Sequence, residues 1–121
     1  MFALMERGEI DGLLRLADAD VVVRPRGMPR ESYRGHAGLR QLLVDAVDHG
    51  RESTVSIDEY VVAGSRVAVL GRIRVRQRKF LSDSSAAWVL ELREGKLTRC
   101  VSYRSHANAL RAVAADAVVA A

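Results

Sequence analysis

The most constraining feature of the chain is a long β-hairpin over Ser84–Arg104. Two segments rich in strand-forming residues flank the two-residue turn Glu94-Gly95, which is typical of a tight hairpin. In the first segment Trp88, Leu90 and Leu92 alternate with their neighbours, so one face of the strand is apolar. Because helical segments precede it, we expect the hairpin to complete a sheet that wraps on helices. Such an architecture usually encloses a pocket, and the function then depends on what the pocket holds.

Apolar periodicity places the helices before the sheet. Phe2–Arg7 is expected to be the end of a first helix. A second, short helix has its apolar stripe at Ile10, Leu13, Leu14 and Ala17. A strand over Val21–Val23 follows. The clearest helix begins after Gly35 and stops at Gly50. Its apolar face consists of Leu39, Leu42, Leu43, Ala46 and Val47.

From Ser53 onwards the apolar period is two, which is typical of strands. The alternating apolar positions, on either side of a turn at Gly64-Ser65, are Val55, Ile57, Val61, Val67, Val69, Ile73 and Val75. We expect a polar loop over Phe80–Ser85 and a closing helix from Ser105. The helices then lie on one side of an antiparallel sheet, which is the α+β class.

Size and composition favour one soluble domain. A length of 121 residues with 49% apolar residues predicts a single domain, residues 1–121, around one core. No segment has the apolar length of a membrane span, and the chain opens with no secretory signal, so we expect a cytoplasmic protein without a membrane partner. The single cysteine, Cys100, excludes an internal disulfide and fits a reducing compartment.

The chain is basic, but its pattern does not favour a nucleic-acid partner. The net charge is +4, and 17 of the 19 basic residues are arginine. The 15 acidic residues are dispersed among them, and aromatic residues, which would stack on bases, make up only 5%. We interpret the arginines as part of a solvated surface.

Metal and phosphate motifs are missing from the sequence. The histidines, His36, His49 and His106, lie far apart and lack acidic or cysteine partners at ligand spacing. The glycine-containing segment Gly35–Gly38 is not followed by the Lys-Ser/Thr of a phosphate loop. We therefore expect no metal site and no cofactor.

Four segments in a characteristic order carry a family resemblance: Arg7–Leu14, Tyr33–Arg40, Gly64–Val69 and Glu94–Arg99. Together they resemble the nuclear-transport-factor-2-like (NTF2-like) superfamily, and within it the SnoaL-like and ketosteroid-isomerase-like proteins. The resemblance implies a cone formed by a curved antiparallel sheet wrapped on three N-terminal helices, with a further C-terminal helix, and often a homodimer through the outer sheet face. Family functions include polyketide cyclisation, steroid isomerisation, epoxide hydrolysis, dehydration and plain binding, so the fold alone does not fix the chemistry.

The resemblance also implies where an isomerase would keep its catalytic residues. The general base would be an aspartate before a proline at the end of the first strand, but here Arg24 precedes Pro25, and a guanidinium cannot accept a proton. The oxyanion-binding tyrosine would stand at or before Met1, and the oxyanion-binding aspartic acid near Trp88. The isomerase constellation is therefore not expected.

The catalytic residues of two further enzyme classes of the family can be compared with this sequence. Members similar to limonene-epoxide hydrolase need two acids, but the corresponding positions hold Gly71–Arg74 and Ser102. A polyketide cyclase needs an acid or base beside an enolisable carbonyl, for which Asp11, Asp20 or His36 would be candidates. We favour exposed or capping roles for these three residues.

Four alternating arginines, Arg72, Arg74, Arg76 and Arg78, share one face of a strand, and two orientations are open. They could form an anion-binding strip inside the pocket. We favour the outer sheet face, because the alternating apolar residues then point inward and several unpaired arginines are not buried.

We therefore predict a small-molecule-binding protein with a mostly apolar pocket and without a recognisable catalytic constellation. The expected ligand is a small hydrophobic or polycyclic molecule. One alternative is a polyketide-cyclase-like or isomerase-like enzyme with a non-standard acid or base, and another is a dimeric interaction module with a filled cavity. The predicted ligand-binding residues are Val23, Arg24, Leu39, Leu43, Ile73, Trp88, Leu90, Cys100 and Ser102.

Overall fold

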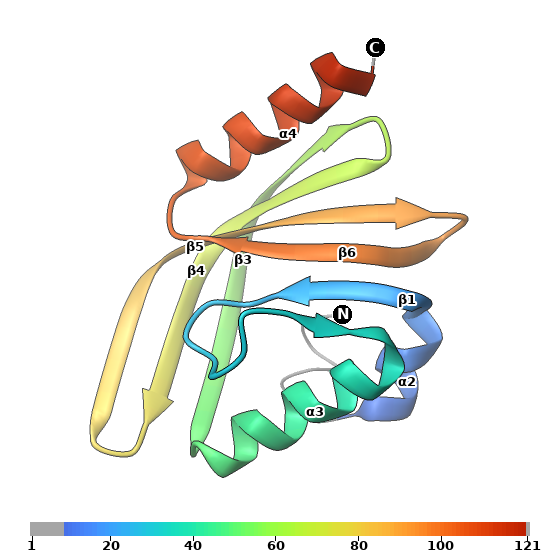
Figure 1. The fold of residues 1–121 in the computed structure, drawn as a ribbon. Helices are drawn as coiled ribbons and strands as arrows, with labels where there is room; N and C mark the ends of the chain where they lie inside the picture. Colours follow the sequence, from blue (N-terminus) through green and yellow to red (C-terminus); the bar gives the residue numbers. More distant parts are fainter. Residues whose placement is uncertain (1–8, 121) are drawn as a thin grey trace.

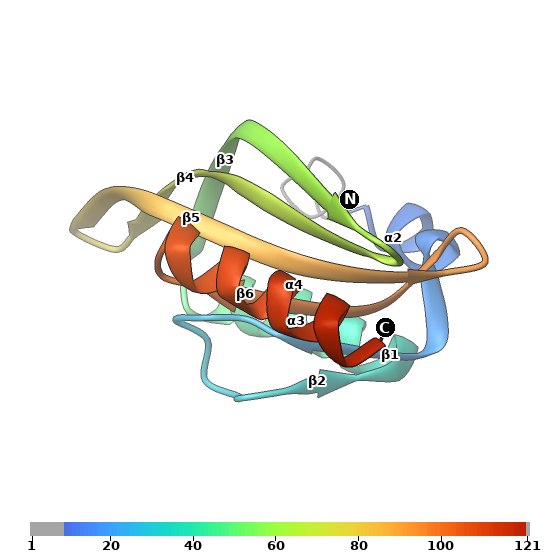
Figure 2. The same ribbon diagram turned by 90° about the horizontal axis from the view of Figure 1, so that it is seen from above.

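A computed structural model describes residues 9–120, with side chains described as far as residue 114. The expected first helix over residues 2–7 lies outside the described residues. Helices and strands follow in the order α2 Ile10–Leu16, β1 Ala17–Arg24, β2 Tyr33–Arg34, α3 Gly35–Asp48, β3 Arg51–Ala63, β4 Arg66–Gln77, β5 Phe80–Arg93, β6 Lys96–Tyr103 and α4 His106–Ala120. The predicted α+β class is confirmed: one curved sheet carries α2 and α3 on one face and α4 on the other (Figures 1 and 2). None of the described helices is long and apolar enough to span a membrane.

The sheet has six strands in the order β2-β1-β6-β5-β4-β3. The expectation of a wholly antiparallel sheet is wrong at one pair, because β1 runs parallel to β6, with Val23 opposite Cys100. All other neighbouring strands are antiparallel. An alternating apolar pattern is the same for both kinds of pairing, so the sequence periodicity could not distinguish them.

The expected polar loop over Phe80–Ser85 is also wrong. These residues form the first half of β5 and pair with β4, with Phe80 opposite Gln77 and Ser85 opposite Arg72. Their side chains are exposed, because this end of the sheet projects away from the helices (Figure 1). A strand exposed on both faces needs no apolar alternation, which explains the misleading sequence signal.

The expected hairpin turn at Glu94-Gly95 is present. Both residues have positive φ values, 52° and 77°, as a type I′ turn requires. Arg78, the last of the four alternating arginines, lies in a second tight turn, between β4 and β5.

Alternation along β4 and β5 divides the core into two clusters on opposite faces of the sheet. On the concave face Val69 and Trp88 pack with residues of α2, α3 and β1. On the outer face Leu70 and Val89 pack against Val113 of α4. The concave face therefore contains the space in which a ligand could be enclosed.

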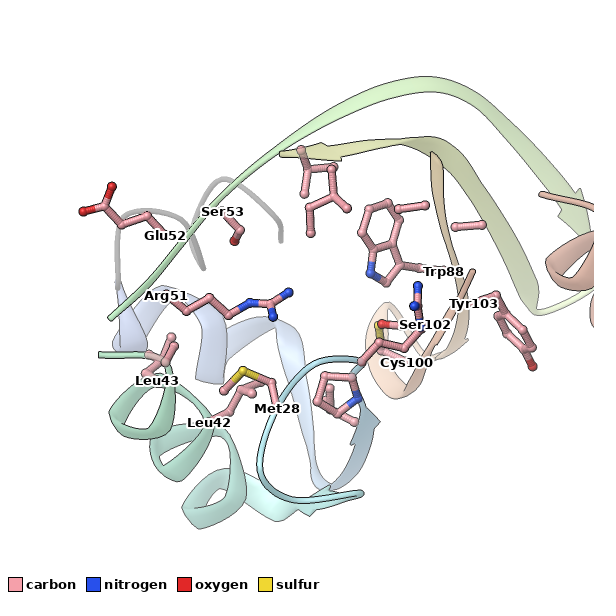
Figure 3. A pocket seen from close by; sticks show the side chains of 18 residues that line it. Met28, Leu42, Leu43, Arg51, Glu52, Ser53, Trp88, Cys100, Ser102 and Tyr103 are labelled. Carbon is pink, nitrogen blue, oxygen red and sulfur yellow. The ribbon is translucent and has the colours of Figure 1, made fainter. Parts of the chain in front are cut away.

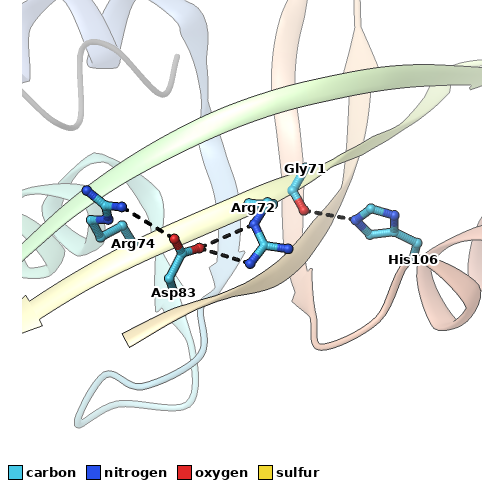
Figure 4. Close-up of polar contacts among 5 residues, drawn as sticks. All are labelled: Gly71, Arg72, Arg74, Asp83 and His106. Atoms are coloured by element: carbon cyan, nitrogen blue, oxygen red, sulfur yellow. Dashed lines mark hydrogen bonds and ion pairs between the residues drawn. The ribbon is translucent and has the colours of Figure 1, made fainter. Parts of the chain in front are cut away.

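The arginines of β4 lie on the outer face, as we favoured. Arg72 and Arg74 are exposed, and both contact Asp83 of β5, at 3.1 Å and 3.5 Å (Figure 4). Nearby, His106 Nε2 lies 2.9 Å from the Gly71 carbonyl oxygen, a hydrogen bond that fixes the start of α4 to β4.

Candidate ligand-binding cavity

A cavity of about 520 Å³ lies between the concave face of the sheet, helix α3 and the segment that follows β1. Figure 3 shows its side chains converging from these elements. The lining is mostly apolar and comprises Val23, Pro25, Arg26, Met28, Leu42, Leu43, Ala46, Arg51, Glu52, Ser53, Val55, Ile73, Ala86, Ala87, Trp88, Cys100, Ser102 and Tyr103.

Strand register explains the composition of this lining. Trp88 of β5 stands opposite Ser102 of β6, and both belong to the set of side chains on the concave face. Cys100, two residues earlier on β6, shares this face and stands opposite Val23 of β1. Ala86 supplies a small side chain beside Trp88, which leaves room in front of the sheet.

Six of the nine predicted ligand-binding residues line the cavity, namely Val23, Leu43, Ile73, Trp88, Cys100 and Ser102. The other three lie elsewhere. Arg24 forms an ion pair with Glu31. Leu39 is a core residue with only 2% of its surface exposed. Leu90 is partly buried and packs against the same core cluster. Leu39 lies one helical turn from Leu43 on the same face of α3, so periodicity predicts the face but not the depth along it.

Arg51 and Arg26 are the basic residues among the lining residues that the sequence analysis did not predict. Arg51 is the first residue of β3. It shares one face of this strand with Ser53 and Val55, which also line the cavity. Extending the alternation of β3 back from Val55 would have placed Arg51 on the concave face. Arg26 follows β1 in a segment without regular structure, so no periodicity could reveal its direction.

The Arg51 side chain is half-buried and points into the cavity (Figure 3). Its Nη1 donates a hydrogen bond of 3.1 Å to the carbonyl oxygen of Gly27. A Cβ on Gly27 would lie 2.5 Å from this nitrogen, and Gly27 also has a φ of +72°, so glycine is required for this contact. Burial, followed by the nearby positive charge of Arg26, lowers the pKa of Arg51 from its ordinary value.

Arg26 is more exposed and stands at the edge of the cavity. Partial loss of water lowers its pKa, and the positive charge of Arg104 lowers it further. Glu31, which lies five residues after Arg26 in the chain, pairs with Arg24. Glu52 is the acidic member of the lining, and its carboxylate points away from the cavity interior (Figure 3). This part of the cavity is therefore positively charged.

Cys100 is buried and has a free thiol. Burial raises its pKa to about 12, so the sulfur is a neutral thiol at physiological pH. It serves as a small apolar surface of the cavity rather than as a nucleophile.

Comparison with known proteins identifies the family. A family model described as the SnoaL-like domain matches residues 1–100. The chain belongs to the SnoaL-like domain family. No curated protein matches this SnoaL-like sequence.

Solved structures with the NTF2-like fold superpose on this SnoaL-like protein. An NTF2-like protein from Burkholderia xenovorans LB400 is 28% identical, with a TM-score of 0.73 over 93% of this chain and 88% of that one. An NTF2-like protein of unknown function from Burkholderia pseudomallei K96243 is 21% identical, with a TM-score of 0.75 over 93% and 90% of the two chains. TerC is 23% identical, with a TM-score of 0.73 over 93% and 91%.

The three acids and bases that the sequence offered for catalysis, Asp11, Asp20 and His36, do not line the cavity of this SnoaL-like protein. Asp11 and Asp20 are exposed. The Nε2 atom of His36 lies 3.1 Å from the Ala17 carbonyl oxygen, so this histidine joins α3 to β1. Within the described residues, no group of three or more His, Cys, Asp or Glu side chains is arranged to hold a metal ion.

A buried polar network supports one side of the cavity. The Asp45 carboxylate of α3 accepts hydrogen bonds from Tyr33 at 2.6 Å, from Gln41 at 2.7 Å and from Arg30 at 3.2 Å. Arg30 and Tyr33 belong to the end of the segment that carries Arg26 and Met28. The network therefore fixes this segment to the helix that provides Leu42, Leu43 and Ala46 to the cavity.

Proposed function

We propose that this SnoaL-like protein binds a small, largely apolar molecule in its cavity. One observation carries the proposal: about 520 Å³ of space behind a mostly apolar lining. Small-molecule sites typically measure roughly 300–1,000 Å³ and combine apolar walls with a few polar groups. Trp88 offers a flat surface to a ring system, and Ser102 offers a hydroxyl for orientation.

The solved neighbours are consistent with a small-molecule function. TerC was crystallised with polyporic acid. Structures of proteins described as putative polyketide cyclases, from Sinorhizobium meliloti and Xanthomonas campestris, share the fold at 17% identity. Identity this low supports a common architecture and leaves the chemistry to the residues of this chain.

We favour binding over polyketide cyclisation or isomerisation. Those reactions need a group that removes a proton beside a carbonyl. The lining from the described residues carries two guanidinium groups, three hydroxyls and a thiol of raised pKa, none of which is a base near neutral pH. Its one carboxylate, Glu52, points away from the cavity interior (Figure 3). In D₂O, we expect this protein not to accelerate exchange of the α-protons of 2-tetralone, measured by NMR; acceleration abolished by a cavity substitution would instead favour the enzyme.

The cavity volume also argues against a module whose interior is filled by its own side chains. Such a module would have no space for a ligand, whereas about 520 Å³ accommodates several fused rings.

Fluorescence titration with N-phenyl-1-naphthylamine, a neutral hydrophobic dye, tests the proposal. Trp88 is the only tryptophan of the chain, so energy transfer from its indole to the dye reports a dye bound near the cavity. We expect saturable dye emission with a matching loss of tryptophan emission. Absence of binding would refute the proposal.

A pair of substitutions on α3 locates the bound dye. Ala46 lines the cavity, whereas Val44 is exposed on the same helix. Filling the cavity with Ala46→Phe should weaken dye binding by roughly tenfold, while Val44→Phe should leave it unchanged. Equal effects of the two substitutions would place the dye outside the cavity.

The proposal includes a homodimer through the outer sheet face. Leu81, which alternates with Asp83 on the outer face, is 67% exposed on the projecting end of β5 beside the arginines of β4, and its neighbour Phe80 is 79% exposed. Exposed apolar side chains of this size favour burial against a partner. Light scattering should give twice the chain mass, and Leu81→Glu should shift the protein towards monomer; a monomeric wild type would refute this part.

A further inference from the structure

We propose that the cavity selects apolar molecules that carry a carboxylate, with Arg51 as its principal binding group and Arg26 as the second. This inference rests on the proposed function and specifies the ligand class for the same site. It predicts an acid such as an alicyclic or polycyclic carboxylate, oriented with its charge towards β3 and its body towards Trp88.

Arg51 has the position and the free donors for this role. Its guanidinium extends into the cavity between Met28 and Trp88 (Figure 3). The hydrogen bond to Gly27 O uses one N–H group of Nη1. A guanidinium carries five N–H donors in a planar arrangement, so four are not used by hydrogen bonds within the described residues. Because Gly27 fixes the side chain, little conformational freedom is lost when an anion binds.

The charges around Arg51 and Arg26 are not neutralised by the described part of the protein. Arg24 and Arg30, which lie close to Arg26 in sequence, form ion pairs with Glu31 and Asp45. Among residues 9–114, neither Arg26 nor Arg51 has an ion-pair partner. The lowered pKa values of both groups reflect the same unfavourable surroundings, namely partial burial beside another cation. A bound anion would offset both effects through its attraction to the two guanidinium groups.

The rest of the lining indicates the second feature of the ligand, an apolar body. Ile73, Val55 and Leu42 present hydrocarbon surface, and Trp88 adds an indole. Planar guanidinium groups bind carboxylates through two parallel hydrogen bonds, which a neutral amide cannot reproduce because its nitrogen is a donor. The cavity therefore combines a hydrophobic body site with a charged site of defined geometry.

Displacement of the neutral dye by two matched probes tests this inference. Adamantane-1-carboxylate and adamantane-1-carboxamide have the same hydrocarbon body and differ in charge. For the wild type, we expect the carboxylate to displace the dye at a concentration roughly tenfold lower than the carboxamide. In Arg51→Gln this preference should fall below about threefold, and Arg51→Lys should give an intermediate value because it keeps the charge but loses the fork.

Two controls separate the possible outcomes. Arg93→Gln removes an exposed arginine at the far end of β5 and should keep the full preference. Dye binding with equal displacement by both probes, or with displacement by neither, would overturn the carboxylate inference while the proposed function stands. A preference that survives both Arg51→Gln and Arg26→Gln would overturn the assignment to these residues. Failure of the dye itself to bind would refute the proposed function.

Discussion

Tyr33 Oη donates a hydrogen bond of 2.6 Å to Asp45 Oδ2, and this contact joins the start of β2 to the last turn of α3. Both residues are buried. Asp45 is the buried charged residue of the described core, and the groups that face its carboxylate from Tyr33, Gln41 and Arg30 are all donors. Two acceptor oxygens are therefore needed at this position.

Asp45→Asn should destabilise the protein, because the new amide group directs a donor towards other donors. We expect the melting temperature to fall by roughly 5 °C or more at pH 7, measured by circular dichroism. Asp48→Asn, an exposed substitution near the end of the same helix, is the control and should change it little. Equal effects of the two substitutions would show that the buried network does not stabilise the fold.

The effect of Asp45→Asn should also depend on pH. The hydrogen bond from Tyr33, followed by the one from Gln41, lowers the pKa of Asp45 in the folded protein. The unfolded chain therefore binds this proton at higher pH, near the usual value of about 3.9. The stabilisation is complete above that value and is lost as the pH falls towards the folded pKa. We expect the melting-temperature gap between wild type and Asp45→Asn to stay constant from about pH 7 to pH 5 and to narrow below about pH 4; a gap independent of pH would contradict this.

Cys100 should react very slowly in the folded protein. With its pKa raised to about 12, the thiolate fraction at pH 8 is on the order of one in ten thousand. We expect 5,5′-dithiobis(2-nitrobenzoate) to modify the native thiol at least about a hundredfold more slowly than the thiol in guanidinium chloride. Rapid modification of the native protein would show that the cavity is open to the reagent and that the thiol is not desolvated.

Gly27→Ala should impair carboxylate selection through Arg51. The new Cβ would lie 2.5 Å from Arg51 Nη1, so the guanidinium must shift from its present position against the Gly27 carbonyl. Gly64 is a matched control, because its φ of +62° gives similar backbone strain while a Cβ there meets nothing within 4 Å. Gly27→Ala should reduce the preference for adamantane-1-carboxylate over its carboxamide by roughly threefold or more. Gly64→Ala should retain it, and equal retention in both would argue against the Gly27 contact as a positioning element.

Gly71→Ala should disrupt the pairing of β3 with β4. A Cβ at this position would lie 2.1 Å from the carbonyl oxygen of Ser56, beside the register shift between Ile57 and Glu59. Because the obstacle is backbone, the strands must separate, and we expect a loss of roughly 2 kcal/mol or more in urea unfolding. Gly50→Ala, where a Cβ meets nothing within 4 Å, should cost less despite its positive φ.

Sequence periodicity predicted the faces of the main strands well. A shift of a strand by one residue would turn all of its apolar side chains to solvent, so the alternating pattern fixes which face is buried. The alternation around Trp88 and Ile73 therefore placed both residues on the concave face. The same reasoning directed Arg72 and Arg74 outward. It failed for Phe80–Ser85, where β5 is exposed and no apolar pattern is needed.

The polar part of the cavity was less accessible to sequence reasoning. The position of Arg24 before Pro25 predicts a place in the site, but the Arg24 side chain pairs with Glu31. Arg51, which does enter the cavity, follows a glycine-terminated helix and lies at the very start of its strand, where alternation is weakest. Arg26 belongs to an irregular segment whose direction depends on contacts with α3, and such tertiary contacts leave no periodic trace in the sequence.

The parallel contact between β1 and β6 has a consequence for the order of assembly. Val23 and Cys100, which stand side by side in the cavity lining, are 77 positions apart in the chain. During synthesis, the ligand site therefore cannot close until nearly every strand has left the ribosome. Closing so long a loop costs entropy, so we expect this architecture to fold slowly.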